Sequence, residues 1–377
     1  MAKDVLKNWL NKPLTLWSAS KLLLAAVAVW GVIACWPKPK VPVRPVILLI
    51  NHYPFTPQDT YFYKQANPFG FLLGIPKREN LDPRILRLEL AEALGRNDFL
   101  FFIDQEGGSV NRLKQFFPQE KAPSPAYFGK LAAKDEESAA QEAYQYGLSV
   151  GKKLKELTVD VVFGPNAEVL PEGEDYLFRS RYYSSSPQIV KRLADAYAAG
   201  LAQGGVIPCY KHAVGASGLN KDPHLVKQEA LYSVQEIREI FLPPFQNASR
   251  WPFLMTAHVL YPAIDVQHVS TYSPAFYRFV REELNFNGLI IPDALNMEAA
   301  DQDAFVSVSE QMNKALAAGA DVVIPFFNVD ANPAWILKEL EAISPAYVKR
   351  LNKKWSALRQ EAFFQEDFSK ENPQNSF

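Results

Sequence analysis

Short apolar runs that end abruptly in polar residues recur along this chain of 377 residues. The run 99–103 leads directly into Asp104-Gln105-Glu106-Gly107-Gly108. A buried strand has no place for a carboxylate, so we expect the acids where the strand stops. The paired glycines allow a sharp turn or a close approach to a ligand. A β/α barrel exposes its site residues on one rim in this way, although a capped turn without function has the same pattern.

The same pattern predicts the fold class. Further apolar runs cover residues 46–50, 159–163, 205–210, 252–256, 288–292 and 321–324, and they end in Asn51-His52, Gly164-Pro165-Asn166, Lys211-His212, Ala257-His258, Asp293 and Pro325. These runs are apolar without alternation, which is typical of buried parallel strands. Stretches rich in Ala, Leu, Glu and Lys lie between them and predict helices at 138–156, 189–203, 234–248 and 306–318. Roughly eight such units favour a (β/α)8 TIM-type barrel in a single catalytic domain over residues 46–377. No G-x-G-x-x-G follows these runs, which weakens the alternative of a doubly wound dinucleotide-binding sheet.

Composition excludes several classes of function. The chain is 48% hydrophobic, which supports one large domain with a sizeable core. Its formal net charge of −1 gives no reason to expect a nucleic-acid partner. Two cysteines and five scattered histidines offer no zinc spacing, so we expect no metal, and Cys209 within an apolar run reads as a buried thiol.

The first 45 residues form a separate segment. Four lysines precede an apolar run of 15 residues at 22–36, which is short for a spanning helix but fits the apolar part of a signal sequence. Val32-Ile33-Ala34-Cys35 resembles the lipobox of bacterial lipoproteins, whose cysteine is acylated, and the Pro-rich stretch 37–45 reads as an extended spacer. An uncleaved signal anchor and a coincidental amphipathic extension are the alternatives. The first two place the domain at a membrane, outside the cytoplasm.

Three segments carry a resemblance to a known family. Residues 102–112 (Phe-Ile-Asp-Gln-Glu-Gly-Gly-Ser-Val-Asn-Arg), 255–265 and 281–297 resemble glycoside hydrolase family 3, and within it the bacterial β-N-acetylglucosaminidases of peptidoglycan turnover. The resemblance extends over roughly 46–364 and implies a barrel. The order of several matched segments makes it more specific than any one motif.

The resemblance implies a catalytic set. The family nucleophile maps to Asp293, which follows an apolar run and would therefore stand on the rim. Its alternative is an N-cap for a helix that begins near Leu295. The acid/base maps to His224, oriented by Asp222, and an unperturbed imidazole pKa near 6.5 suits a group that both donates and accepts a proton. An exposed loop histidine is the alternative for His224.

The loop before this histidine departs from the family pattern. The family reads Lys-His-Phe-Pro-Gly-His-Gly, whereas residues 211–218 read Lys-His-Ala-Val-Gly-Ala-Ser-Gly. Pro223 also restricts Asp222 to extended conformations. Because Asp222 and His224 are both retained, we still expect activity.

The resemblance also implies a group of residues that bind the sugar. It comprises Asp104 as an acceptor, with Arg112, Arg181, Lys211 and His212 as donors. A neutral sugar needs several charge-assisted hydrogen bonds. Arg179 is a rival for Arg181, and an ion pair with Asp104 or Glu106 is the alternative role of Lys211 and Arg112. His258 either lines the pocket or is structural.

The implied activity is that of a retaining exo-β-N-acetylglucosaminidase. It would cleave terminal β-linked N-acetylglucosamine from muropeptide-like peptidoglycan fragments by double displacement, without metal or organic cofactor. A β-glucosidase or phosphorylase of the same family is a second hypothesis, because a histidine acid/base leaves the site less anionic and lets phosphate compete with water. A non-catalytic wall-binding lipoprotein is the third, because the loop is altered.

Overall fold

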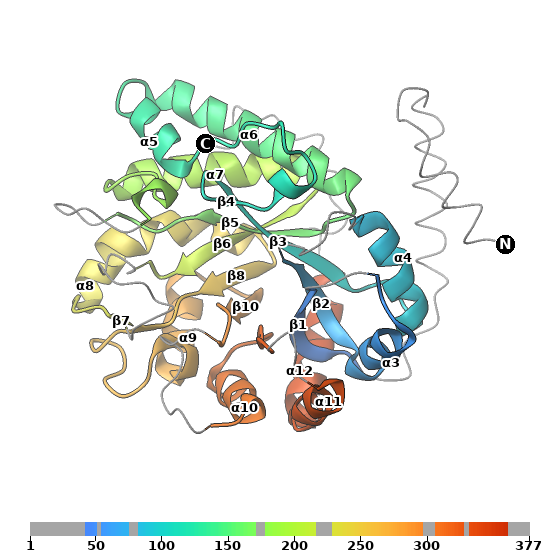
Figure 1. Ribbon diagram of the computed structural model, residues 1–377. Coiled ribbons are helices and arrows are strands. Elements are labelled where there is room, and N and C mark those ends of the chain that lie inside the picture. Colours follow the sequence, from blue (N-terminus) through green and yellow to red (C-terminus); the bar gives the residue numbers. More distant parts are fainter. Residues whose placement is uncertain are drawn as a thin grey trace.

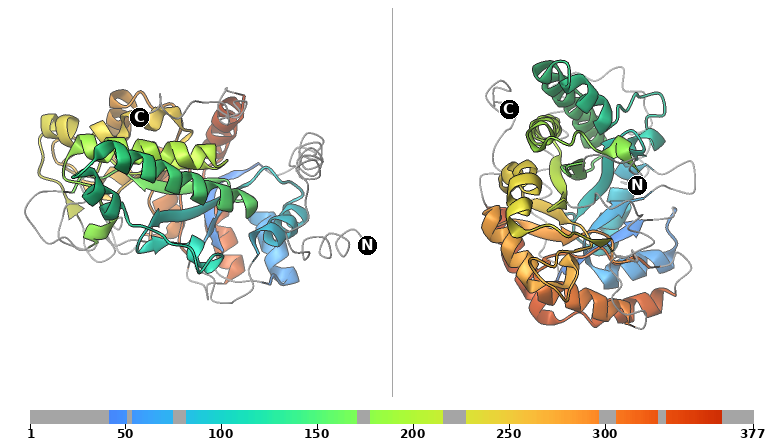
Figure 2. Two further views of the ribbon diagram at one scale, coloured as in Figure 1. Left: turned by 90° about the horizontal axis from the view of Figure 1, so that it is seen from above. Right: turned by 90° about the vertical axis from the view of Figure 1, so that its left-hand side faces the viewer.

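A computed structural model describes residues 42–50, 54–74, 82–170, 178–215, 228–296, 306–327 and 332–360. In this part of the chain a curled parallel β-sheet lies in the middle, and helices pack around its outside (Figure 1). The hydrogen-bonded order is β1 (Arg44–Ile50), β2 (Pro68–Leu73), β3 (Leu100–Gly107), β5 (Val161–Asn166), β6 (Ile207–Ala213), β8 (Phe253–Thr256) and β10 (Leu289–Pro292). The colours of Figure 2 run around the sheet in chain order, as expected for repeated β/α units.

Most predicted runs coincide with strands of this sheet, but β2 was not predicted. Its sequence starts with Pro68 and contains Gly70, two residue types that are depleted in strands. Gly70 is needed for packing, because a Cβ there would lie 2.6 Å from both the Leu100 carbonyl oxygen and the Phe102 ring. The polar end of β1, Asn51-His52, lies outside the described residues.

The prediction that the strand stops at Ile103 was wrong. Parallel pairing with β5 ends at Asp104, but β3 continues to Gly107 and there pairs in antiparallel with β4 (Val110–Asn111). Glu106 therefore lies inside a strand with its side chain fully buried. Two cationic side chains neutralise it, which the local sequence did not indicate.

Three of the four predicted helices, at 138–156, 189–203 and 306–318, are confirmed. With six that were not predicted, the described residues form nine α-helices of eight residues or more. They are α3 (Pro57–Ala66), α4 (Pro83–Leu94), α5 (Pro125–Ala132), α6 (Glu136–Glu156), α7 (Pro187–Gln203), α9 (Pro274–Glu283), α10 (Val308–Ala318), α11 (Pro333–Glu341) and α12 (Pro345–Leu358). The predicted helix 234–248 is instead divided into α8 (Val234–Glu236), a π-helical turn η4 (Ile237–Phe241) and a 3₁₀ segment η5 (Pro243–Arg250). Two prolines at 243 and 244 explain the break, because each lacks the N–H that an α-helix needs. None of the helices in the described ranges is long and apolar enough to cross a membrane.

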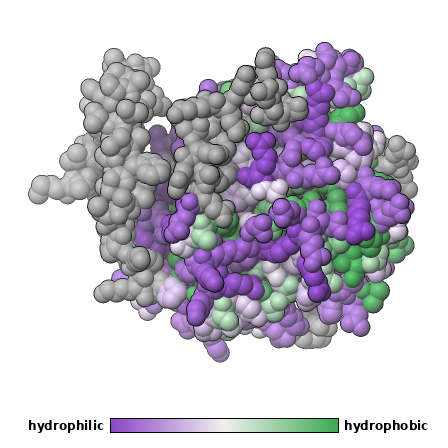
Figure 3. Space-filling model, turned by 180° about the vertical axis from the view of Figure 1, so that it is seen from behind, coloured by the Kyte–Doolittle hydropathy of each residue, from purple (hydrophilic) through white to green (hydrophobic). Residues whose placement is uncertain are grey.

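Apolar side chains fill both faces of the sheet. Inside the curl, Phe69, Phe102 and Phe253 pack together with the free thiol of Cys209, and Trp355 from α12 covers them at one end. Outside, a larger cluster lies between the strands and the helices. The outer surface seen from behind is mainly hydrophilic (Figure 3). This double burial explains why the strands lack alternation.

Residues 321–324 connect the two ends of the strand order. The Asp321 N–H donates to the Ile290 carbonyl oxygen of β10 at 2.9 Å, and the Ile47 N–H of β1 donates to the Val323 carbonyl oxygen at 2.9 Å. The Asp321 carboxylate also accepts from the Ile290 N–H at 2.8 Å and pairs with Arg281 at 2.6 Å and Lys354 at 3.0 Å. This carboxylate lies near the amino end of β10, away from Asp293 at its carboxyl end.

We expect Asp321→Ala to lower the free energy of unfolding by about 2–3 kcal/mol. This is less than the roughly 3–5 kcal/mol of a fully buried pair, because Arg281 and Lys354 keep 28% and 25% of their side chains exposed and can regain water. Urea denaturation at neutral pH measures the change. Glu310→Ala, which removes an exposed ion pair with Lys314, is the control and should change stability little. Equal midpoints for the two variants would contradict the prediction.

Candidate active site

The described candidate residues gather at the carboxyl ends of the strands. Asp104 lies in β3, Lys211 and His212 lie in β6, and Asp293 directly follows β10. Arg181 lies in η3 (Arg179–Arg181), on the segment that follows β5. Because the strands are parallel, these ends meet at one edge of the curled sheet. The prediction that these residues share a rim is thus consistent with the strand order, while their individual roles stay predictions.

A connected set of charges links three of these elements. The Lys211 Nζ lies 2.8 Å from Asp104 Oδ1 and 2.8 Å from Glu106 Oε1, and the Lys211 side chain is only 3% exposed. On the other side, Arg181 donates from Nε to Glu106 Oε2 at 2.9 Å and from Nη2 to Oε1 at 2.7 Å. The ion-pair interpretation of Lys211 is therefore confirmed. The paired geometry holds the Lys211 and Arg181 side chains in place before any ligand arrives.

Electrostatics keeps this set charged. Burial alone would raise the pKa of Glu106, but the charges of Arg181 and Lys211 bring it well below its usual value. Burial would lower the pKa of Lys211, but the carboxylates of Asp104 and Glu106 raise it above its usual range. Each charge thus depends on the others, so the set behaves as one unit.

Asp293 is held at the end of β10 by its own backbone. Its N–H donates to the Thr256 carbonyl oxygen at 2.9 Å, and its Oδ1 accepts from the Ala294 N–H at 2.7 Å. The side chain is 27% exposed, and Oδ2 lies 3.7 Å from His212 Nε2. Burial alone would raise the pKa of Asp293, but His212, His258 and the Ala294 N–H lower it below the usual value. The carboxylate is therefore ionised and partly accessible.

His258 is placed as a structural residue. It is 2% exposed, its Nδ1 lies 2.5 Å from Thr271 Oγ1, and its Nε2 lies 3.0 Å from the Ala294 carbonyl oxygen. Both ring nitrogens are thus engaged by the protein, and burial lowers the pKa of this imidazole. The geometry favours the structural alternative, in which His258 supports the backbone next to Asp293.

Sequence reasoning missed one acidic residue of this cluster. Glu168 follows the end of β5 at Asn166, is 3% exposed, and its Oε2 lies 3.3 Å from His212 Nδ1. The signal was present in the sequence, because Glu168 closely follows the apolar run 159–163, much as Asp293, which the family resemblance identified, follows the run 288–292. Glu106 was recognised only as an alternative partner for Lys211 or Arg112.

The structure separates Arg181 from its rival Arg179, describes Arg112, and does not describe Asp222 or His224. Arg181 is the arginine that contacts Glu106, whereas Arg179 is exposed, which supports the choice of Arg181. Arg112 is half-buried before η2 (Leu113–Gln115), and within the described ranges no ion pair involves it. Asp222 and His224 lie outside the described residues.

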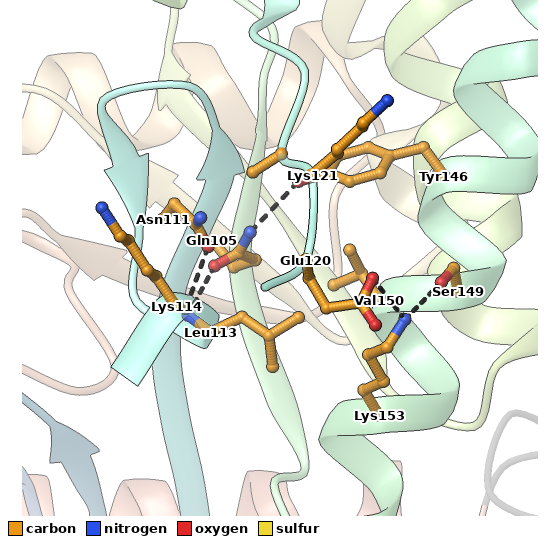
Figure 4. Close-up of a pocket in the computed structure, with 11 residues that line it drawn as sticks. Gln105, Asn111, Leu113, Lys114, Glu120, Lys121, Tyr146, Ser149, Val150 and Lys153 are labelled. Carbon is orange, nitrogen blue, oxygen red and sulfur yellow. Dashed lines mark hydrogen bonds and ion pairs between the residues drawn. The ribbon is translucent and has the colours of Figure 1, made fainter. Parts of the chain in front are cut away.

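A small cavity of about 30 Å³ lies beside β3 but is not this site. Gln105 points into it, because successive side chains of a strand alternate and Gln105 lies between Asp104 and Glu106. Its amide donates to the Tyr146 hydroxyl at 3.2 Å and accepts from the Leu113 N–H at 2.9 Å (Figure 4). The cavity therefore marks where the β3–β4 extension is anchored against α6.

Comparison with known proteins identifies the family of this chain. The family model described as glycosyl hydrolase family 3 N terminal domain matches residues 84–349. The chain belongs to this family. It is 31% identical over 290 residues to a beta-hexosaminidase of Neisseria meningitidis serogroup A, covering 76% of this chain and 79% of that protein.

Solved structures of the family have the same fold. Native NagZ from Neisseria gonorrhoeae superposes with a TM-score of 0.70 at 25% identity, covering 87% of this chain and 96% of that one. A structure of the same protein in complex with N-trifluoroacetyl-D-glucosamine gives 0.67 at 26% identity, over 87% and 97% of the two chains. The protein is thus a glycoside hydrolase similar to bacterial β-hexosaminidases, and its substrate is a carbohydrate.

Glu106→Gln should destabilise the protein at neutral pH by about 2–3 kcal/mol, because it removes the carboxylate that pairs with Arg181 and leaves the buried Lys211 paired with Asp104 alone. The folded pKa of Glu106 lies below its unfolded value of about 4.3, so the unfolded chain binds more protons and wild-type stability falls as pH drops below that value. The difference between wild type and variant should therefore shrink in acid. Urea denaturation at pH 7 and pH 4 measures it, and a difference that grows in acid would contradict the assignment.

Proposed function

We propose that the protein is a retaining exo-β-N-acetylglucosaminidase that acts on peptidoglycan fragments by double displacement. The observation that carries this proposal is the ionised, partly exposed Asp293 carboxylate beside His212 and the Asp104–Lys211 pair. A retaining glycosidase needs such a carboxylate at one face of the sugar, close to groups that bind its hydroxyls. Asp293 is the proposed nucleophile.

The spacing around Asp293 argues for a separate acid/base. In retaining glycosidases that use two carboxyl groups, nucleophile and acid/base lie about 5–5.5 Å apart to accommodate the glycosidic bond. His212 Nε2 lies 3.7 Å from Asp293 Oδ2, which suits a sugar-binding neighbour better than a proton donor on the leaving-group side. We assign that second role to His224, with Asp222 as its partner, and sugar binding to Asp104, Arg112, Arg181, Lys211 and His212.

We further propose that the sheet closes as a (β/α)8 barrel within a single domain spanning 46–377. The hydrogen bonds of residues 321–324 to both β10 and β1 support closure, with this segment as the eighth strand. A closed barrel would fix the distance between Asp104 on β3 and Asp293 after β10.

The choice of N-acetylglucosamine rests on the names of similar proteins and on the charged groups of the candidate site. The similar Neisseria proteins are named beta-hexosaminidase, and one was solved with an N-acylglucosamine. The Asp104–Lys211 pair and Arg181 offer both acceptors and donors, as a neutral polyhydroxylated sugar requires. Release of p-nitrophenol from its β-N-acetylglucosaminide, with and without phosphate, separates hydrolase, phosphorylase and a non-catalytic binding protein.

Asp293→Ala should abolish turnover of p-nitrophenyl β-N-acetylglucosaminide and leave folding intact, because this rim carboxylate contributes little to the core. A 2-fluoro glycosyl donor of the same class should label Asp293 in the wild-type protein, as read by peptide mass mapping. The circular dichroism melt of the variant is the control. Covalent label on a different residue would refute the nucleophile assignment.

His224→Ala should slow hydrolysis of glycosides with poor leaving groups far more than hydrolysis of aryl glycosides, because activated leaving groups need little protonation. The pH–rate limb that depends on His224 should shift in Asp222→Asn. Steady-state kinetics on a disaccharide and on the nitrophenyl glycoside measure both effects. Equal losses on the two substrates would indicate a structural role for His224.

For location, we propose a lipoprotein attached to a membrane outside the cytoplasm, with a signal anchor as the alternative. Residues 1–41, which contain Cys35, lie outside the described residues, so the support is the sequence pattern alone. A helix long enough to span would have to include Lys21, at a cost of about 2.5–3.5 kcal/mol at the helix centre and less near an end.

Cys35→Ser should therefore leave an unprocessed precursor, heavier by residues 1–34 and lacking lipid. Several acyl chains contribute about 0.8 kcal/mol per buried CH₂, enough for stable attachment of the wild type. The intact mass of the protein in the membrane fraction, compared between wild type and variant, distinguishes the lipoprotein from the signal anchor. A variant that differs from wild type by the substitution alone would support the signal anchor instead.

A further inference from the structure

We propose that Glu168 is a positioning residue, whose carboxylate holds His212 through Nδ1 and thereby aims Nε2 at Asp293 and the bound sugar. The proposal rests on the proposed function, in which His212 binds the sugar and Asp293 attacks it. Its evidence is a line of three side chains, formed by Glu168, His212 and Asp293. Glu168 Oε2 lies 3.3 Å from His212 Nδ1, and His212 Nε2 lies 3.7 Å from Asp293 Oδ2.

Glu168 is itself fixed in position by the backbone around it. Its N–H donates to the Asn166 side-chain oxygen at 3.1 Å, and the Ala167 N–H donates to the Lys211 carbonyl oxygen at 2.6 Å. The turn after β6 packs against it, because a Cβ on Gly215 would lie 3.4 Å from the Glu168 Cα. The backbone of Glu168 is thus fixed beside β6, and this places its carboxylate within reach of the His212 imidazole.

The second carboxylate oxygen of Glu168 is the unusual feature. Oε1 is buried and has no hydrogen-bond partner among the described residues. A buried carboxylate is costly unless a donor or a cation compensates it, so its contact with His212 is important for both residues. Arg181 also interacts electrostatically with this carboxylate, so the His212 contact and the Arg181 charge together compensate its burial.

The contact selects which nitrogen of His212 carries a proton. With Nδ1–H donating to Glu168, the other nitrogen faces Asp293. In the charged ring this Nε2–H donates to the Asp293 carboxylate, and in the neutral ring its lone pair can accept only from a bound sugar hydroxyl, because the ionised carboxylate has no proton to donate. Among the described residues, ionisable groups that interact with Glu168, His212 or Asp293 include Lys211 on β6, His258 after β8 and Arg181 on η3.

Removal of the Glu168 charge should affect catalysis more than folding. For Glu168→Gln we expect kcat/KM on p-nitrophenyl β-N-acetylglucosaminide to fall roughly 10- to 100-fold, by analogy with the loss of a carboxylate that orients a metal-binding histidine. His212 lowers the pKa of Asp293, so a loosened ring should also move the acid limb of kcat/KM to higher pH. Glu168→Asp keeps the charge and should retain an acid limb close to that of the wild type.

The matched control is Glu339→Gln on α11. Glu339 is also buried, and its carboxylate accepts from the Ser309 N–H at 2.7 Å, on an element that supplies none of the candidate site residues. This variant makes the same chemical change and should leave the pH profile unchanged. A shifted acid limb in Glu339→Gln, or an unshifted limb with undiminished kcat/KM in Glu168→Gln, would overturn the proposal.

A spectroscopic readout tests the contact independently of turnover. The chain has five histidines, so ¹⁵N-histidine labelling gives a tractable spectrum, and His212→Asn assigns the signals of His212. We expect a protonated Nδ1 on His212 in the wild type and a changed Nδ1 signal in Glu168→Gln but not in Glu339→Gln. An unchanged signal would refute the role of Glu168 even if the enzyme is active. An inactive wild type would instead refute the proposed function and leave this readout valid.

Discussion

The buried carboxylate of Glu106 is the interaction on which the candidate site depends. It pairs with Lys211 from β6 and with Arg181 from η3, and Lys211 in turn reaches Asp104 on the same strand as Glu106. Three segments far apart in the sequence are thus fixed by one ion network. Because Glu106 is buried, its loss would leave Arg181 without this partner and Lys211 with Asp104 alone, so the network depends on this one carboxylate.

Buried and partly exposed carboxylates distinguish the two edges of the sheet. At the amino ends of the strands, Asp160 and Asp321 accept from strand N–H groups and pair with Arg87 and with Arg281, and these contacts stabilise the fold. At the carboxyl ends the carboxylates of Asp104 and Asp293 keep part of their side chains exposed. In a parallel sheet all amino ends lie at one edge and all carboxyl ends lie at the opposite edge. Only the carboxyl-end edge is open to a ligand.

Many helix starts and most strands could be read from the sequence. Seven of the described helices begin with Ser, Thr, Asp or Asn followed directly by proline, which combines a side-chain cap with a preset backbone angle. This signal indicates α3, α4, α5, α9, α11 and α12, which the composition of the intervening stretches did not reveal. β2 was not predicted because Pro68 and Gly70 are residue types that disfavour a strand. Glycine is required at position 70 because Leu100 and Phe102 approach it closely.

The sequence by itself determined the order of the β/α units and the position of Asp104, Lys211 and Asp293 at strand ends, because apolar periodicity and breaks in it are local properties. Only the tertiary structure decided which charges meet. Glu106 was expected beyond a strand end and lies inside the strand, and Glu168 received no role until it lay beside His212. The energy of a buried carboxylate depends on cations from distant segments, and no local pattern encodes that distance.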